Sequence, residues 1–491
     1  MRGRGWLLVA LGVAGAAYLV AYEPRLHYLF PSVIDDWSAL AQPAGPQLRE
    51  LAELGTPEAD RYRPGFVVWN VLQWHTLGAP EALEGPRLWG ALRAGLLVAG
   101  VTLALAVFAD PRRLVRDRRW WVASALVAGG AVAALTAPSL VVDVVRYGPQ
   151  EPLLVAGCAL GAALLVVAGR SLLAADPVGP RVAALVVCGL AAWWLGVLQK
   201  ETSPCLLLLA PFLLPSARAQ RDRWRALGHR RKLGLAALGA GVLLPFVPVI
   251  AWTVHLSRAD DRLYADLPLT KSYPQRLADQ LSQAGDVLHS PLPAAIVLAS
   301  VALLAVRLTR RDVDWFSIGL LVVAFAFVAY VAEIGIVTSR YLLPPIVLAA
   351  IVLVRSAVAL GPRTAQVVGV ALLALGTAQA VEARGWVHDW VEVEERREAL
   401  VREAAARAAG GCEVGYVGLN VELVLAVPVL VPLAHEPARD CAPGERFLVV
   451  IDPGGPGTET PPDDPVVAAC APETTPAYAS EVGKIVRCTA S

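Results

Sequence analysis

Two adjacent carboxylates, Asp35 and Asp36, are the residues near the start of the chain whose type and spacing best suit chemistry. They follow the first apolar stretch, within the sequence YLFPSVIDDWSAL, and their aromatic and apolar neighbours indicate a segment that packs against other parts of the protein. A pair of carboxylates in such a setting can act as a general base or hold a divalent cation. The alternative is a solvated loop turn, because Asp is common in turns.

Further ionisable residues stand at the ends of apolar stretches. Lys200 and Glu201 end one stretch, Glu151 opens another, and Arg340 precedes a third. Charged groups at the level of a membrane are costly to bury, so they mark candidate functional sites. Each also has a plainer explanation. Lys200 and Glu201 would form an ion pair. Glu151 would be an acid at a helix N-terminus, where the helix dipole favours it. Arg340 would extend its side chain to the membrane interface from a helix end.

The composition indicates which elements must position these residues. The chain has 491 residues, of which 56% are hydrophobic and 17% charged, and its mean hydropathy is +0.54. A soluble protein could not bury so much apolar surface, whereas helices of about 20 apolar residues cross a bilayer. We therefore expect an α-helical polytopic membrane protein with about 11 transmembrane helices. They are predicted near residues 6–22, 88–109, 120–138, 152–169, 182–199, 204–215, 233–256, 291–306, 316–334, 341–359 and 365–383.

The first of these stretches also resembles a signal peptide. Basic residues precede it, and Ala14-Gly15-Ala16 offers a small-residue cleavage pattern. The stretch continues apolar well beyond that point, and we therefore expect an uncleaved anchor.

Basic residues are concentrated in one set of loops, which predicts the orientation. The loops at 110–119, 216–232 and 307–312 are rich in Arg, whereas the opposite loops carry more acids than bases. Since Lys and Arg are enriched in cytoplasmic loops, the N-terminus is expected in the cytoplasm, and an odd number of spans places the C-terminal tail outside. The localisation predicted is the cytoplasmic membrane. These basic loops follow the topology rule, so they are no evidence for nucleic-acid binding.

The polar tail carries Cys412, Cys441, Cys470 and Cys488. Four cysteines in one short segment predict two disulfides in an oxidising compartment, with three possible pairings. A zinc site is the alternative, but the tail has no CxxC pair. We expect an amphipathic connecting helix at 384–411 and a small extracytoplasmic α/β domain at 412–491.

Several short motifs occur in an order that resembles the C-type glycosyltransferase (GT-C) superfamily. These are membrane transferases that use polyprenyl-phosphate sugars, and they include protein O-mannosyltransferase-like and aminoarabinose-transferase-like enzymes. The motifs are Asp35-Asp36, RYRP at 61–64, RYGPQEPL at 146–153, Lys200-Glu201 and SRYLLPPIVL at 339–348. They cover the transmembrane region, predicted as a GT-C-like domain at 1–383 whose outer loop, 23–87, carries the acids. The O-mannosyltransferase pattern has Asp-Glu where this chain has Asp-Asp.

The resemblance implies a role for each candidate residue. Asp35 or Asp36 would deprotonate the acceptor hydroxyl, and the same pair would be the ligands of any divalent cation. The lipid phosphate of the donor would be the leaving group, and cations stabilise such an anion where its charge develops. Arg63, Lys200 and Arg340 are the implied phosphate ligands. The implied supporting residues are Arg61, Arg146, Glu151 and Glu201.

The function expected is an integral membrane glycosyltransferase that acts at the outer face. Its partners would be a polyprenyl-phosphate-linked sugar, the lipid bilayer and a glycan, lipid or protein acceptor. The alternative is a transporter or flippase of lipid-linked glycans, which should place ionisable residues in the middle of the membrane. Here they gather at the ends of the spans.

Overall fold

The computed structural model describes most of the transmembrane region and parts of the tail. The described residues are 5–27, 64–66, 68–69, 72, 84–145, 150–174, 179–213, 225, 227–258, 271–334, 338–417, 441–442, 445–451, 470–480 and 482–490. All statements below concern these residues.

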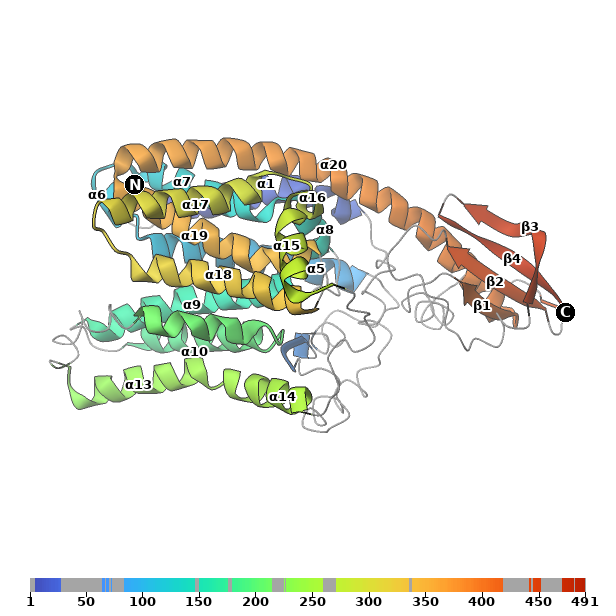
Figure 1. The fold of residues 1–491 in the computed structure, drawn as a ribbon, viewed down its shortest axis with the longest axis horizontal. Coiled ribbons are helices and arrows are strands. Elements are labelled where there is room, and N and C mark those ends of the chain that lie inside the picture. Colours follow the sequence, from blue (N-terminus) through green and yellow to red (C-terminus); the bar gives the residue numbers. More distant parts are fainter. Residues whose placement is uncertain are drawn as a thin grey trace.

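The described part of the membrane region is a bundle of long apolar helices (Figure 1). Its helices are α1 (Gly5–His27), α5 (Glu84–Ala109), α6 (Arg112–Arg116), α7 (Trp120–Leu135), α8 (Pro138–Val145), α9 (Glu151–Leu173), α10 (Pro180–Val197), η2 (Ser203–Leu209), α13 (His229–Leu243), α14 (Phe246–Arg258), α15 (Tyr273–Ser282), α16 (Ala284–Leu288), α17 (Leu292–Thr309), α18 (Trp315–Ile334), η3 (Ser339–Leu342), α19 (Leu343–Leu360) and α20 (Pro362–Ala409). Several begin with Pro in the first turn, where its fixed φ suits the helix and no amide donor is lost.

Nine described helical segments are long and apolar enough to cross a membrane, as judged by length and composition. A tenth results if α7 and α8, which meet at an angle of 76°, are counted as one broken span. The predicted polytopic helical fold is therefore confirmed. The stretch predicted at 204–215 is the short apolar segment Ser203–Leu213, which does not reach the length of a span by itself.

That short segment nevertheless lies on a return path of the chain. Figure 1 shows that α10 and α13 both begin at the end of the bundle away from the sheet, so the chain must run back between them. η2 lies on this return path, within its described residues 198–213. A 3-10 helix rises by about 2 Å per residue, so each of its residues crosses more of the bundle's length than a residue of an α-helix does.

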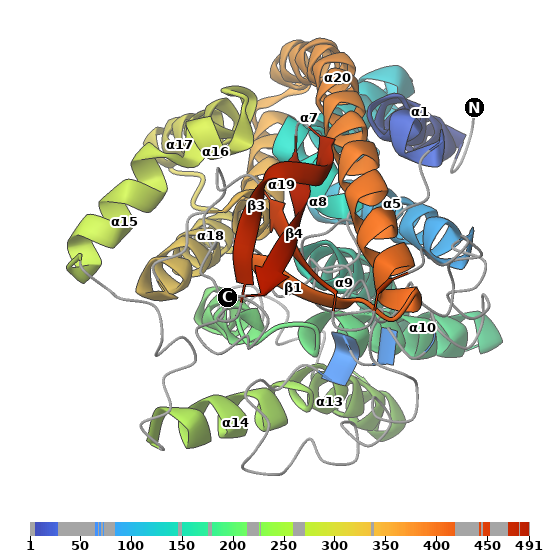
Figure 2. The same ribbon diagram turned by 90° about the vertical axis from the view of Figure 1, so that its right-hand side faces the viewer.

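The helices pack around α19, which is the most buried of the candidate spans. α5, α7, α17, α18 and α20 contact it, and the pair α13 and α14 lies at the edge of the bundle farthest from α20 (Figure 2). Gly361 joins α19 to α20 with φ of +119°, a conformation that L side chains rarely adopt. α20 then runs the length of the bundle and continues beyond it as one 48-residue helix.

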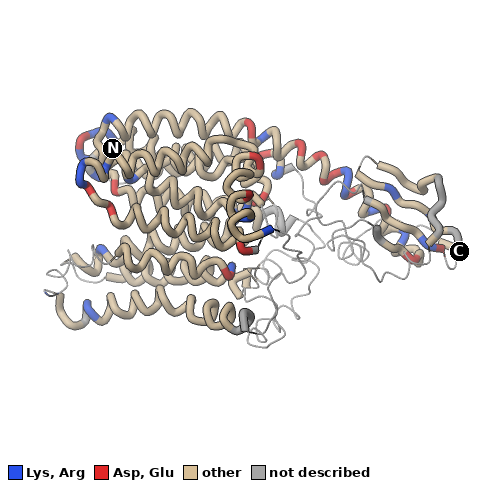
Figure 3. Tube along the Cα trace, in the orientation of Figure 1, with Lys and Arg blue, Asp and Glu red and all other residues tan. Residues whose placement is uncertain are grey.

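Charged residues mark the two ends of the bundle, and few lie between them (Figure 3). We call the end that contains Glu151, Lys200 and Arg340 the sheet-domain end, because α20 leaves the bundle there to reach the sheet. The other end, which contains Asp314 and Arg355, is called the opposite end. There Asp314 accepts hydrogen bonds from Arg307, Arg355 and Ser317, which joins α17, α18 and α19.

The described part of the tail forms a four-stranded mixed sheet with the order β1-β2-β4-β3. Its strands are β1 (Glu413–Val417), β2 (Arg446–Ile451), β3 (Cys470–Ser480) and β4 (Gly483–Ala490). β1 and β2 are parallel, and the other neighbours are antiparallel. The end of α20 packs on this sheet, where the Arg407 guanidinium lies 4.4 Å from the ring centre of Phe447.

Two disulfides connect the elements of the tail. Cys412–Cys441 lies next to the end of α20, and Cys470–Cys488 joins β3 to β4. Of the three possible pairings, the structure therefore has the one that links cysteines adjacent in sequence order. Both bridges close short loops, of 29 and 18 residues in sequence separation, and such loops contribute roughly 3 kcal/mol each in the chain-entropy account.

The helices α9 and α10 approach each other unusually closely. A Cβ atom on Gly161 would lie 2.6 Å from the backbone nitrogen of Trp193, and one on Gly157 would lie 2.7 Å from the carbonyl oxygen of Ala192. Gly157 and Gly161 are four residues apart on one face of α9, and small residues at this spacing let membrane helices pack with their backbones in contact. This contact sets the separation of the two helices whose other residues form the candidate site.

We predict opposite effects for two Gly→Ala substitutions in α9. Gly161→Ala should destabilise the protein by about 1–3 kcal/mol, because its methyl group would meet the backbone of α10. Gly169→Ala is the matched control: its Cβ would meet only Leu238, at 4.0 Å, and Ala favours a helix over Gly by about 0.5–1 kcal/mol. Denaturant unfolding in detergent micelles measures both free energies, and equal values would contradict the proposed close contact.

Candidate functional site

Three segments that are far apart in sequence meet at the sheet-domain end of the bundle. They are the first turn of α9, the residues that follow α10, and η3. The Lys200 ammonium lies 2.5 Å from Glu151 Oε1 and donates a hydrogen bond of 3.2 Å to Tyr341 Oη. The side chains of the ion pair are only 3% and 2% exposed. Glu151 and Lys200, both predicted from sequence, therefore form a buried ion pair.

Two cationic groups lie near the ring of Tyr341. Lys200 Nζ lies 4.4 Å from the centre of its ring, and Arg340 Cζ lies 5.5 Å from it. Tyr341 is buried, whereas Arg340 is half-buried. A cation within about 6 Å of an aromatic ring is attracted to its face. The ring therefore holds Lys200 and Arg340 close together, although the two cations repel each other.

Several polar atoms around the ion pair are buried without a partner. In the described part of the chain, no hydrogen bond is made by Glu151 Oε2, by Ser203 Oγ or by either polar atom of the Gln199 amide. Gln199 and Ser203 are fully buried. A buried polar group without a partner costs about 1–3 kcal/mol, so such groups require an explanation.

A short part of the first large loop packs on the end of α10. The Gly65 amide donates a 2.9 Å hydrogen bond to the carbonyl oxygen of Leu198. A Cβ on Gly65 would lie 2.8 Å from the Leu195 carbonyl oxygen, which explains a glycine at this position. Pro64 and Gly65 are buried. Gly65 directly follows the motif RYRP, and Leu198 lies two residues before Lys200. The end of the motif is therefore close to the segment that carries Lys200.

An acid that sequence reasoning missed supports the η3 segment. Asp143 of α8 is buried, and its Oδ2 accepts a hydrogen bond from Ser339 Oγ. Ser339 directly precedes Arg340 and Tyr341, so this bond fixes the turn that carries them. Arg93 of α5 is also buried and donates to the Val144 carbonyl oxygen next to Asp143. The sequence signal was a lone acid in the apolar stretch LVVDVV.

The predicted site residues are thus only partly brought together in the described structure. Glu151, Lys200 and Arg340 meet there, and Glu201 is buried beside them and lines a small cavity of about 200 Å³ with Tyr330. The remaining predicted residues lie outside the described residues: Asp35, Asp36, Arg61, Arg63 and Arg146.

An apolar cavity of about 500 Å³ begins directly below this cluster. Leu154, one helical turn from Glu151, lines its upper part together with Pro344, one turn from Tyr341. It continues toward the opposite end between α9, α10, α13, α18 and α19, where Phe108 and Phe316 line it. Leu213 and Gly239 on its wall are exposed, so the cavity opens toward the surrounding lipid.

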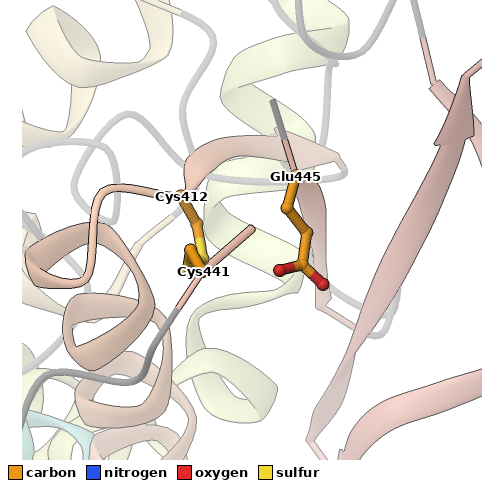
Figure 4. Close-up of side chains that lie close together, drawn as sticks. All are labelled: Cys412, Cys441 and Glu445. Atoms are coloured by element: carbon orange, nitrogen blue, oxygen red, sulfur yellow. A yellow bond between two sulfur atoms is a disulfide. The ribbon is translucent and has the colours of Figure 1, made fainter. Parts of the chain in front are cut away.

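Among the described residues, one group has side chains spaced like metal ligands. The ligand atoms of Cys412, Cys441 and Glu445 lie within 4.8 Å of one another (Figure 4). The two sulfur atoms are joined in a disulfide, so they cannot serve as thiolate ligands. Hydrogen bonds from the Ala442 amide and from Arg487 hold the pKa of Glu445 below its usual range, which is explained without a metal.

Two solved structures share the fold of this chain. Against the crystal structure of apo ArnT from Cupriavidus metallidurans the TM-score is 0.52, with 13% identity and coverage of 99% of this chain and 98% of the other. Against ArnT from the same organism bound to undecaprenyl phosphate it is 0.51, with 16% identity and the same coverage. No protein-family model and no curated protein matches the sequence. The predicted likeness to the aminoarabinose-transferase-like membrane enzymes is confirmed at the level of fold.

We predict that the ion pair is far more sensitive to the loss of one partner than to the loss of both. Lys200→Met should destabilise the protein by about 3–5 kcal/mol, because it leaves the Glu151 carboxylate buried and unpaired. Adding Glu151→Gln to this variant should recover most of the loss. The measurement is the free energy of unfolding in detergent micelles.

The exposed pair Lys271–Asp279 supplies the control. Its atoms are 2.7 Å apart, but its side chains are 58% and 32% exposed. Lys271→Met should therefore change the stability by less than about 1 kcal/mol. A similar small effect of Lys200→Met would contradict a buried ion pair.

Proposed function

We propose that this chain is an integral membrane glycosyltransferase that transfers a sugar from a polyprenyl-phosphate donor to an acceptor at the outer face of the cytoplasmic membrane. One observation carries the proposal most directly. In an ArnT-like fold, two cations, Lys200 and Arg340, lie beside Tyr341, and an apolar cavity begins about one helical turn from Tyr341 at Pro344.

The two parts of this site match the two parts of a polyprenyl phosphate. Its phosphate would contact Lys200 and Arg340, since arginine and lysine are the residues that bind phosphate oxygens. Its isoprenoid chain would occupy the apolar cavity, which begins one helical turn away at Leu154 and Pro344. The likeness to an ArnT structure bound to undecaprenyl phosphate supports this assignment.

The buried polar atoms fit the sugar or the phosphate of the same donor. Gln199 offers both a donor and an acceptor, and Ser203 offers a hydroxyl. Glu151 holds the Lys200 ammonium with one carboxylate oxygen. In the described structure its second oxygen is buried and makes no hydrogen bond.

The reaction proposed is a single displacement at the anomeric carbon of the sugar. Asp35 or Asp36 takes the proton of the acceptor hydroxyl, and the acceptor oxygen forms a bond to the anomeric carbon. The bond between that carbon and the phosphate oxygen breaks, and its electron pair stays on the polyprenyl phosphate. Lys200 and Arg340, together with Arg63, stabilise this charge as it develops. A direct displacement inverts the configuration of the sugar.

The rival function, a transporter of lipid-linked glycans, is supported less well. Transporters place ionisable residues near the middle of the membrane, often in broken helices. In the described helices, the charged residues lie toward the two ends of the bundle (Figure 3). This arrangement favours chemistry at the surface of the membrane.

We predict that Arg340→Gln weakens the binding of undecaprenyl phosphate to the purified protein by at least about tenfold, since a charge-assisted phosphate contact contributes about 1.5–3 kcal/mol. Lys271→Gln, an exposed cation at the same end of the bundle, should leave binding unchanged. Titration of the lipid against intrinsic tryptophan fluorescence measures both dissociation constants. Equal affinities for both variants would remove Arg340 from the donor site.

We predict that Asp35→Asn or Asp36→Asn lowers the rate of sugar transfer from undecaprenyl-phosphate sugars by about 10²–10⁴-fold, the usual contribution of a general base. Binding of undecaprenyl phosphate itself should persist, because the proposed base contacts the acceptor. Transfer is followed with a radiolabelled sugar, and detergent-solubilised membranes serve as the source of acceptor. Unchanged transfer by both variants would refute the assignment of the base.

The orientation is tested with one introduced cysteine at a time, in a background in which both accessible free cysteines are replaced by Cys188→Ser and Cys205→Ser. Ser282 is exposed near the sheet-domain end, and Thr309 is exposed at the opposite end. Each is replaced by cysteine in turn. A membrane-impermeant maleimide should label Ser282→Cys in intact cells, and Thr309→Cys only after lysis. The reverse pattern would place the site in the cytoplasm and contradict the proposed function.

A further inference from the structure

A large cavity lies at the opposite end of the bundle, at the far ends of the two helices that carry Glu151 and Lys200. Its volume is about 1300 Å³, and the end of α9 and the beginning of α10 form most of its wall. Its lining residues are Arg112, Leu164, Val167, Arg170, Ser171, Ala174, Gly179, Pro180, Arg181, Val182, Ala184, Leu185 and Cys188. We call it the arginine groove.

Three exposed arginines, Arg112, Arg170 and Arg181, line the arginine groove. No acid occurs among the described residues that line it, and Asp176, in the segment between α9 and α10, lies outside the described residues. The nearest described acid in contact is Asp110, which lies 3.2 Å from Arg112 in a solvent-exposed pair. Arg170 donates a hydrogen bond of 3.3 Å to the carbonyl oxygen of Val107, which leaves most of its guanidinium donors directed elsewhere. The described lining of the groove therefore carries a net positive charge.

The remaining wall of the arginine groove is apolar. Leu164, Val167 and Leu185 lie one to two helical turns from the arginines, toward the middle of the bundle. The arginines stand at the level where the helices α9 and α10 leave the apolar part of the bundle. A ligand that fits both parts has an anionic head and an apolar tail that begins directly beside it.

We propose that the arginine groove binds the phosphate headgroup of an anionic phospholipid, with the upper part of one acyl chain along Leu164, Val167 and Leu185. A free phosphate or a soluble phosphate ester matches the arginines but leaves the apolar wall exposed. A zwitterionic lipid matches the apolar wall, but its ammonium group meets three arginines. Anionic phospholipid alone is complementary to the whole groove, because basic groups at a membrane boundary attract anionic headgroups.

The groove and the candidate site share one helical hairpin. α9 begins at Glu151 and ends at Leu173, and α10 returns from Pro180 to Val197, just before Lys200. Close contacts at Gly157 and Gly161 hold the two helices together along the way. The arginine groove lies at the end of this hairpin where the chain passes from α9 to α10. A lipid that contacts both helices there should raise the unfolding temperature of the full chain.

The test compares two triple variants that remove the same charge. Arg112→Gln, Arg170→Gln and Arg181→Gln together empty the groove of cations. Arg310→Gln, Arg311→Gln and Arg363→Gln together form the control, because these arginines are exposed at the same end of the bundle and do not line the groove. Both variants and the unchanged chain are delipidated in detergent and titrated with phosphatidylglycerol, with phosphatidylcholine and with glycerol 3-phosphate. Native mass spectrometry counts the bound lipid, and the unfolding temperature is followed in parallel.

We expect one phosphatidylglycerol to bind the unchanged chain and the control variant at least tenfold more tightly than phosphatidylcholine, and to raise their unfolding temperatures. The groove variant should lose this preference. Glycerol 3-phosphate should not bind at the same concentrations. An equal loss of phosphatidylglycerol affinity in both triple variants would mean that general surface charge causes the binding. Equal affinity for phosphatidylcholine would mean that apolar contact alone causes it. Either result overturns the proposal, and so does tight binding of glycerol 3-phosphate.

A milder variant covers the case in which the groove variant fails to fold. Arg181→Gln changes one exposed side chain of the groove, and Arg363→Gln is its control. Arg181→Gln should weaken phosphatidylglycerol binding about threefold, and an unchanged affinity would contradict a direct headgroup contact. None of these measurements uses sugar transfer, so their failure is distinguishable from failure of the proposed enzyme activity.

Discussion

The buried ion pair between Glu151 and Lys200 is the interaction on which the arrangement of the candidate site depends. Two charges that are almost fully removed from solvent must lie in contact, because either one alone would be strongly destabilising in a medium of low dielectric constant. Their contact fixes the end of α10 against the beginning of α9. It also fixes Tyr341, which accepts a hydrogen bond from the same ammonium. Three segments from distant parts of the chain are thereby held in one geometry.

Packing makes this contact possible, and hydrogen bonds extend it. The glycines of α9 allow its backbone to touch that of α10, so the two ends cannot drift apart. On the other side, the bond from Ser339 to Asp143 holds the η3 turn, which places Arg340 beside the ring of Tyr341. Two cations are kept together here by an acid, an aromatic ring and rigid helix ends. Such preorganised positive charge is suited to an anion that forms during a reaction, since the protein need not rearrange to stabilise it.

Sequence reasoning was most successful for features that depend only on residues close together in the sequence. Hydropathy alone indicates the spans, because each one must satisfy its own backbone hydrogen bonds in lipid. It also found Glu151, Lys200 and Arg340, since ionisable residues at the ends of spans are unusual. It could not foresee that Lys200 pairs with Glu151, because the sequence neighbour Glu201 was an equally plausible partner. Asp143 was missed for a related reason: its role depends on Ser339, 196 positions away. The pairing of the four tail cysteines was likewise open, and it is the antiparallel pairing of β3 with β4 that brings Cys470 within two register positions of Cys488.

The position of the charges relative to the apolar cavity argues for a lipid phosphate rather than for a soluble anion. A site for a soluble anion needs cations and access from water, and it gains nothing from an apolar space beneath it. Here Leu154 and Pro344 bring the wall of a cavity of about 500 Å³ within one turn of Glu151 and Tyr341. An apolar surrounding also strengthens the electrostatic interactions of a buried charge, because the local dielectric constant is low. An amphipathic donor would fill both regions at once, with its reactive bond at the boundary between them. The groups that stabilise the leaving phosphate would then be the same groups that determine how deep the donor sits.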